Sequence, residues 1–154
     1  MTGLVVREGG LGDPQVTALL AYHHREAHKG FPPGFAHALD PAALRHPDIR
    51  FFAAWDEEAL AGIGALRALG GGEAEVKSMR TDPAQLGRGV GRMILDRLVA
   101  AARDDGHARL NLETGVGSRF VAATVLYERF GFVDRDAFGG YPPSPHNRFM
   151  TLAL

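Results

Sequence analysis

The sequence predicts a single α+β domain over residues 1–154, with six to seven strands and about four helices. Its 154 residues, 45% of them hydrophobic, supply enough apolar surface for one core and too little for two. Short apolar runs alternate with polar residues as in half-buried strands, whereas longer runs repeat every three or four positions as in amphipathic helices. Turn residues separate these runs, so strands and helices are mixed along the chain.

The chain is predicted to begin with a strand and two helices. Residues 4–8 (LVVRE) form the strand, and Asp13 followed by Pro14 caps the first helix. The segment KGFPPGF at residues 29–35 ends that helix, and Asp40-Pro41 opens a short second helix. One face of the first helix carries Val16, Leu19, Leu20, His23 and Ala27.

Three consecutive strands follow, then helices alternate with strands. Residues 50–56 and 60–69 are apolar runs joined by a polar turn, which predicts an antiparallel hairpin, and residues 73–81 (EAEVKSMRT) form the next strand. From Val90 the apolar residues have helical spacing up to a C-cap at Gly106. Residues 108–114 form a strand, residues 120–130 a helix closed by Gly131, and two strands complete the order, the last at residues 147–154.

The charge and the cysteine content exclude several classes of function. A formal net charge of −1 gives no overall basic field for nucleic acid or an anionic membrane surface. The absence of cysteine excludes disulfides, thiolate zinc sites and a cysteine nucleophile, and suits a reducing compartment. No signal-peptide core and no run of about 20 apolar residues occurs, so we expect a cytoplasmic protein.

Three glycines and two arginines lie around the start of the helix at Val90, in LGRGVGRMIL (residues 86–95). A nucleotide-binding P-loop is excluded because no lysine followed by a hydroxyl residue comes after Gly91. A dinucleotide-binding fingerprint is excluded because the glycines are spaced by two and follow an antiparallel hairpin. Bare N–H groups at a helix N-terminus favour pyrophosphate, and Arg88 and Arg92 add positive charge. The alternative is a flexible glycine turn before an ordinary helix.

The loop LGRGVG at residues 86–91 is followed by the segment LYERFGF at residues 126–132. With these two motifs in this order, essentially the whole chain resembles the GCN5-related N-acetyltransferase (GNAT) superfamily. Its loop motif, Arg/Gln-x-x-Gly-x-Gly/Ala, lies at residues 86–91, with Leu86 in place of the arginine or glutamine. The motif L-Y-x-x-x-G-F is present without change at residues 126–132. Seven residues before that tyrosine the superfamily often has an asparagine, whereas this chain has Phe120. The segments HALD, KSMRT, ETG and FMTLAL further resemble small bacterial acetyltransferases whose substrates are poorly assigned.

The resemblance implies an α/β GNAT-like fold with a mixed, mostly antiparallel central sheet, and acetyl-CoA as the cofactor. It implies that the loop amides hold the pyrophosphate and that a backbone N–H at residues 79–81 stabilises the oxyanion. The residues expected at the cofactor are Met79, Arg80, Thr81, Leu86, Gly87, Arg88, Gly89, Val90, Gly91, Arg92, Phe120 and Ala123.

Acetyl transfer to an amine requires a proton acceptor, because an alkylamine titrates near pH ~10. Glu75 is the first candidate base, acting directly or through one water, because its position relative to Gly89 resembles that of the glutamate base in the histone-modifying branch. Glu113 is the second candidate, and water alone is the remaining alternative. Tyr127 is the candidate proton donor to the departing CoA thiolate, with core packing as its alternative role.

Strict alternation along residues 73–81 predicts two faces for this strand. One face carries Glu75, Lys77, Met79 and Thr81, and the other carries Val76, Ser78 and Arg80. Glu75 and Arg80 are therefore expected on opposite sides of the sheet.

The first helix and the loop after it commonly wall the acceptor pocket in this fold. His24 and His28 have an i, i+4 spacing that can chelate zinc, but HREAH lacks the H-E-x-x-H order, so no metal is expected. His23 lies on the apolar face and is expected to be a core histidine. The residues expected at the substrate are Tyr22, His24, His28, Phe31, Glu113 and Tyr141.

The sequence therefore predicts an acetyl-CoA-dependent N-acetyltransferase that acts on a primary amine, of a small molecule or an amino acid, by direct attack on the thioester. A non-catalytic acyl-CoA sensor and a protein-directed acetyltransferase are the alternatives. The bulky side chains of Phe31, Phe35, Phe138 and Tyr141 favour a closed small-molecule pocket over an open groove. No nucleic-acid or membrane partner is expected, and homodimer formation stays open.

Overall fold

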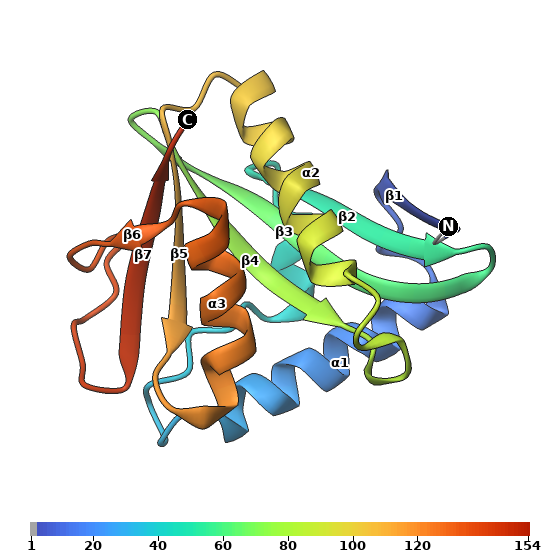
Figure 1. The fold of residues 1–154 in the computed structure, drawn as a ribbon, viewed down its shortest axis with the longest axis horizontal. Coiled ribbons are helices and arrows are strands. Elements are labelled where there is room, and N and C mark those ends of the chain that lie inside the picture. The colour runs from blue at the N-terminus through green and yellow to red at the C-terminus, as the bar shows by residue number, and fades with distance from the viewer. Residues whose placement is uncertain (1–2) are drawn as a thin grey trace.

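The computed structural model describes residues 3–154, which form a seven-stranded sheet with helices on both faces (Figure 1). The strand order is β1-β2-β3-β4-β5-β7-β6. Strands β4 and β5 are parallel and the other neighbouring pairs are antiparallel, which confirms the predicted mixed sheet. The strands are β1 (Leu4–Glu8), β2 (Ile49–Asp56), β3 (Ala59–Gly70), β4 (Glu73–Thr81), β5 (Arg109–Gly115), β6 (Val133–Asp134) and β7 (Asn147–Ala153).

The helices form two layers on either side of the sheet (Figure 1). Helix α2 (Val90–Asp104) and helix α3 (Val121–Phe130) cover one face, where Ile94 and Leu98 lie in the larger hydrophobic core. Helix α1 (Pro14–Lys29) covers the other face, where Val16 and Leu20 pack against residues of β2 and β3. No helix in the described part of the chain combines the length and hydropathy that crossing a bilayer needs.

The ends of the helices lie where the capping residues predict them. The Asp13 carboxylate accepts a hydrogen bond from the Gln15 backbone N–H at 2.8 Å, which satisfies one of the free amides of α1. Helix α2 ends at Asp104, and Gly106 follows it with a φ of +80°. Gly131 closes α3 with a φ of +98°, a conformation in which glycine has no steric penalty.

The predicted short second helix is present as a 3₁₀ helix, so the described chain has three α-helices rather than the expected four or so. Asp40 caps a five-residue 3₁₀ helix, η1 (Pro41–Arg45). His46, which precedes Pro47, has a ψ of 142° and ends the helix. The proline ring disfavours helical geometry in the residue before it, and this keeps η1 short.

Strand β4 contains a bulge at Ser78. The predicted strict alternation of side chains between the two faces of the sheet is therefore wrong after Lys77. Ser78 and Met79 together lie opposite the single residue Gly64 of β3, and Ser78 has a φ of +52°. Met79 packs into the core under α2, whereas Arg80 donates a hydrogen bond to a residue of α1. The extra residue thus brings Arg80 to the same face as Glu75.

Strands β4 and β5 diverge after a short parallel contact (Figure 1). Their pairing covers Glu73–Glu75 on β4 and residues 109–111 on β5. Beyond Glu75 the backbones separate, so the two strands form a V that opens toward α1 and α3. This opening positions the candidate site.

Candidate active site

A cavity of about 240 Å³ lies where β4 and β5 separate. Residues from both strands, from α1 with its following loop, and from the start of α3 form its walls. It is lined by His23, Glu26, Ala27, Phe31, His37, Ala38, Glu75, Val76, Lys77, Ser78, Met79, Arg80, Leu112, Glu113, Thr114, Gly115, Arg119, Phe120, Ala123 and Tyr127.

Glu75, the first candidate base, lies in this wall with 1% of its surface exposed. Its Oε1 accepts a hydrogen bond from the Tyr141 hydroxyl at 3.2 Å, and its Oε2 lies 3.5 Å from Lys77 Nζ. Burial raises the pKa of the Glu75 carboxyl, and the Lys77 ammonium opposes this shift. Glu75 is thus a desolvated carboxylate with its pKa moved toward neutrality.

Two buried polar atoms at the cavity have unused hydrogen-bonding capacity. Within residues 3–154, Glu75 Oε2 and Ser78 Oγ are the buried side-chain oxygens without a hydrogen-bond partner. Both residues line the cavity. Buried polar groups in folded proteins are nearly always satisfied, so both oxygens are available to hydrogen-bond water or a molecule bound in the cavity.

Lys77 and Tyr141 join Glu75 to the loop after α1. Lys77 Nζ donates to the Tyr141 hydroxyl at 2.9 Å and to the His37 carbonyl oxygen at 3.1 Å. The His37 and Tyr141 rings stack with centroids 4.9 Å apart. Burial and the neighbouring Glu75 carboxylate raise the pKa of Tyr141, so its hydroxyl stays protonated and donates to Glu75. The predicted substrate residue Tyr141 therefore supports the candidate base.

Glu113, the second candidate base, also lies in the cavity wall, on the opposite strand β5. Its Oε2 bonds His37 Nδ1 at 2.5 Å and accepts from the Asn147 amide at 2.9 Å. The carboxylate and the imidazole thus form a dyad, and Glu113 has less free acceptor capacity than Glu75.

Tyr127 is buried on α3 and reaches the cavity from the side of the larger hydrophobic core, under α2 and α3. Its ring packs edge-on against Phe132, with centroids 5.9 Å apart. Burial raises the pKa of Tyr127 to about 12, and the positive charge of Arg80 opposes the rise. The phenol is therefore fully protonated at neutral pH, as a proton donor must be.

His23 and Arg80 form a polar contact between α1 and β4. Arg80 Nε donates to His23 Nδ1 at 3.0 Å, and the Arg80 guanidinium lies 5.7 Å from the centroid of the Tyr22 ring. Burial lowers the pKa of His23 to about 4, and the charge of Arg80 adds to this effect. His23 is therefore a neutral acceptor in the cavity wall rather than a residue of the apolar core.

The glycine loop presents an open backbone at the start of α2. Gly89 is the N-cap residue with a φ of +77°, and no side chain caps the helix. Gly87 has a φ of +80°, and a Cβ at either glycine would meet no atom within 4 Å. Free first-turn N–H groups beside open space fit a pyrophosphate, so these residues can hold that part of acetyl-CoA.

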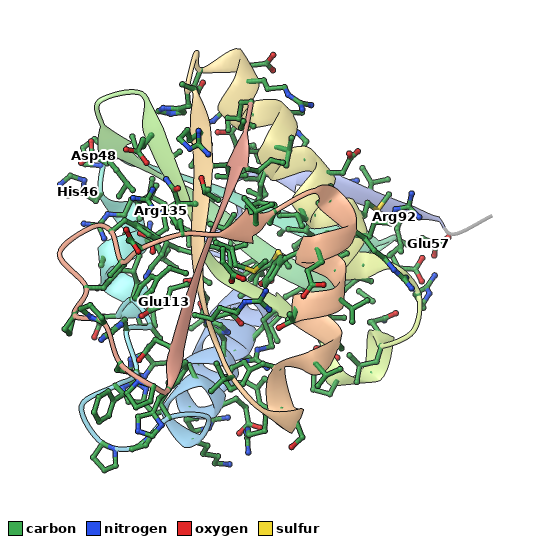
Figure 2. All side chains as sticks on the ribbon, turned by 60° about the vertical axis from the view of Figure 1, so that its left-hand side comes forward. His46, Asp48, Glu57, Arg92, Glu113 and Arg135 are labelled. Atoms are coloured by element: carbon green, nitrogen blue, oxygen red, sulfur yellow. The ribbon has the colours of Figure 1, made fainter. Side chains whose placement is uncertain are left out.

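The side chains around the loop differ in what they contact. Arg88 Nη1 donates to Asp56 at 2.9 Å and to Gln85 at 2.6 Å, so its charge is partly compensated within the protein. Leu86 is 69% exposed. Arg92 is exposed, and Figure 2 shows it on the opposite side of the view from Glu113.

Phe120 closes one end of the cavity. A Cβ at Gly115 would lie 2.2 Å from the Phe120 ring, and one at Gly30 would lie 2.9 Å from it, so both glycines admit the ring. Phe31 contacts the same ring, with centroids 5.4 Å apart. This large side chain occupies space at the position where the superfamily often has asparagine.

The predicted substrate residues fall into two groups. Phe31 and Glu113 line the cavity, and Tyr141 bonds two of its residues. Tyr22, His24 and His28 lie on α1 outside the lining. His28 Nδ1 bonds the His24 carbonyl oxygen at 2.8 Å, which ties it to its own helix.

The site contains His37 and Lys77, whose roles the sequence analysis did not identify. His37 lies 76 positions from Glu113 and Lys77 lies 64 positions from Tyr141, so no local pattern links either pair. A lysine two residues after the candidate glutamate, on the same face of the predicted strand, was the one available signal.

Comparisons with known proteins identify the family to which the chain is similar. Residues 16–132 match the model of the Acetyltransferase (GNAT) family. The chain is 43% identical to the uncharacterized N-acetyltransferase YedL of Escherichia coli, over 97% of this chain and 94% of that protein. It is 40% identical to the uncharacterized N-acetyltransferase YsnE of Bacillus subtilis, over 91% of this chain and 93% of that protein.

A solved structure shows the same fold. A Bacillus subtilis acetyltransferase in complex with CoA superimposes with a TM-score of 0.73 at 16% identity, over 98% of this chain and 99% of the other. The chain belongs to the acetyltransferase (GNAT) family. It is an acetyl-CoA-dependent acetyltransferase, which confirms the class and the cofactor that the two motifs predict.

Proposed function

We propose that the protein transfers the acetyl group of acetyl-CoA to a primary amine of a small molecule or amino acid, by direct attack of the amine on the thioester. The observation that carries this proposal is the buried Glu75 carboxylate, whose Oε2 lacks a hydrogen-bond partner at the cavity. An incoming ammonium group has protons to donate at that atom. The volume of about 240 Å³ and the aromatic wall of Phe31 and Phe120 favour a small acceptor over a polypeptide tail.

Glu75 is proposed as the general base. Its Oε2 takes a proton from the acceptor ammonium, directly or through one water, so that the amine becomes nucleophilic. The raised pKa of Glu75 improves the match between the carboxylate and an amine. Lys77 and Tyr141 hold the carboxylate in place from the side of β4 and the β6–β7 loop.

Tyr127 is proposed as the proton donor. Acetyl-CoA supplies the activated acetyl group as a thioester; the C–N bond forms as the C–S bond breaks. The Tyr127 hydroxyl, protonated at neutral pH, gives its proton to the departing sulfur. Backbone N–H groups at residues 79–81, where β4 has separated from β5, are proposed to stabilise the developing negative charge.

A screen of acceptors tests this function. Purified protein with acetyl-CoA is offered amino acids, polyamines, aminoglycosides and short peptides, and release of free CoA thiol is followed. We expect turnover with small primary amines and little with peptides. Tight CoA binding without turnover on any acceptor would instead support the non-catalytic sensor.

A further inference from the structure

Arg80 is a charged side chain of the cavity wall that lacks an acidic partner. Its Nε donates to neutral His23, and its guanidinium lies over the Tyr22 ring. In the described part of the chain it forms no ion pair with a carboxylate. Burying half of an arginine side chain without a neighbouring anion costs free energy. Residues 3–154 place no anion in contact with the Arg80 guanidinium to offset this cost.

The other charges at the cavity are already paired. Glu75 lies beside Lys77, and the Glu113 carboxylate bonds His37. Glu26, whose field reaches Arg80, is paired with Lys29 at 3.0 Å and with Arg119 at 3.8 Å. Among the lysines and arginines that line the cavity, Arg80 is therefore the one without a carboxylate at ion-pair distance in the described part of the chain.

The bulge in β4 turns Arg80 away from the glycine loop (residues 86–91) that is expected to hold the cofactor. It turns the Arg80 side chain toward α1, whereas the glycine loop begins α2 on the opposite face of the sheet (Figure 1). Lys77 and Arg80 pair with Ala65 and Ile63 of β3, which belong to the core under α1, and Glu75 alternates with Val76 of the other core, so all three lie on the same side. Arg80 therefore shares its face with the candidate base rather than with the glycine loop.

From this placement we propose that the acceptor is an amino acid, an amine and a carboxylate in one small molecule, and that Arg80 binds the carboxylate. This inference rests on the proposed function and specifies its substrate class. A planar guanidinium matches a carboxylate with two parallel N–H···O bonds. The carboxylate of the amino acid forms an ion pair with Arg80, and its amine donates a hydrogen bond to Glu75 Oε2. One ligand thus supplies both the anion for Arg80 and the hydrogen-bond partner for Glu75.

Matched acceptors test the carboxylate requirement. Each of a panel of amino acids is compared with its carboxamide and with the corresponding decarboxylated amine. We expect wild-type kcat/KM to be roughly 10- to 100-fold higher for the amino acid, the range of a charged hydrogen bond. Equal kcat/KM for the acid, the amide and the amine would overturn the inference while leaving the acetyltransferase function intact.

Variants of Arg80 test the assignment of the residue. Arg80→Gln should remove the preference for the carboxylate, chiefly through KM, and Arg80→Lys should restore part of it because the charge remains. Arg129→Gln, at an exposed arginine of α3, is the matched control and should behave as wild type. Calorimetry should show unchanged CoA affinity in Arg80→Gln. A loss of CoA affinity with an equal loss on all acceptors would assign Arg80 to the cofactor and overturn the inference.

A binding measurement separates failure of the inference from failure of the proposed function. N-acetyl amino acids and their amides are titrated into the CoA-bound protein, and no turnover is needed. Carboxylate-dependent binding that is lost in Arg80→Gln supports the inference even if no acceptor is acetylated. Absence of that dependence overturns it, whatever the turnover.

Discussion

Lys77 Nζ lies 3.5 Å from Glu75 Oε2, and the two residues are 7% and 1% exposed. The pair places a positive charge directly beside the proposed base, in the wall of the cavity. Removing two charges from water is unfavourable, and the hydrogen bonds from Lys77 to Tyr141 and His37 offset part of this cost. The stability of this pair and the proton affinity of the base are therefore coupled.

Replacing Glu75 tests the base directly. Glu75→Gln keeps the size of the side chain and removes the proton acceptor, so kcat/KM near neutral pH should fall by about 10²–10⁴-fold. CoA affinity, measured by calorimetry, should stay nearly constant because the glycine loop is untouched. The melting temperature serves as the control for folding, since Lys77 loses its partner. Full activity of the variant would transfer the role to Glu113 or to water.

Replacing Lys77 should change the pH dependence of the rate. Lys77 lowers the pKa of Glu75 against the effect of burial, so Lys77→Met should raise that pKa further. The base must be deprotonated to act, and the acid limb of kcat/KM should therefore move to higher pH. A pH profile that coincides with wild type would contradict the coupling.

The same substitution should make stability depend more strongly on pH. The Glu75 pKa is raised in the folded protein, so its stabilising contribution is present below the unfolded pKa of about 4.3 and is lost as pH rises through the folded value. In Lys77→Met that loss should extend to higher pH. At neutral pH the unpaired carboxylate should lower the free energy of unfolding by about 3–5 kcal/mol. Denaturant titrations at a series of pH values measure both effects.

Replacing Tyr127 distinguishes catalysis from core packing. Tyr127→Phe retains the ring that packs against Phe132 and removes the hydroxyl. A proton donor acts only as the C–S bond breaks, so kcat should fall by about 10²-fold while acetyl-CoA affinity is retained. Equal kcat in the two proteins would leave Tyr127 a packing residue.

A negative charge in the glycine loop should weaken cofactor binding. Gly89 has a left-handed conformation, which asparagine and aspartate tolerate similarly, and a Cβ there meets open space. Gly89→Asp should therefore raise the Kd for CoA at least about tenfold more than the neutral control Gly89→Asn, because its carboxylate repels the pyrophosphate. Equal Kd values for the two variants, measured by calorimetry, would show that the loop does not hold the phosphates.

The order of the elements was predictable because local signals determine it. Asp13, Gly106 and Gly131 cap helices at the predicted places, and the hydrophobic repeats of α1 and α2 identify their buried faces. The extent of η1 was not predicted, because the effect of Pro47 on His46 competes with the helix opened by Asp40-Pro41.

Residues of the candidate site that belong to short local motifs could be predicted from the sequence. Residues that join the site through contacts between distant parts of the chain could not. The glycine loop and Tyr127 follow from short motifs, and Glu75 from its position on the strand before the loop. The side of the sheet on which Arg80 lies depends on the bulge at Ser78, which leaves no mark in the alternation of residue types. His37 becomes part of the site because the loop after α1 packs on the sheet and brings it to Glu113 of β5 and Lys77 of β4.

The three-residue pairing of β4 with β5 also has a mechanical consequence. It divides the sheet into one half of four strands and one of three, joined at one end and open at the other. A molecule bound in the opening contacts both halves of the sheet and holds them in a fixed relative position. Ligand at about 100 times its Kd adds roughly 2.7 kcal/mol to the free energy of unfolding. The backbone amides of residues 112–115, in the part of β5 that is not paired with β4, should therefore exchange with solvent more slowly when substrate is bound.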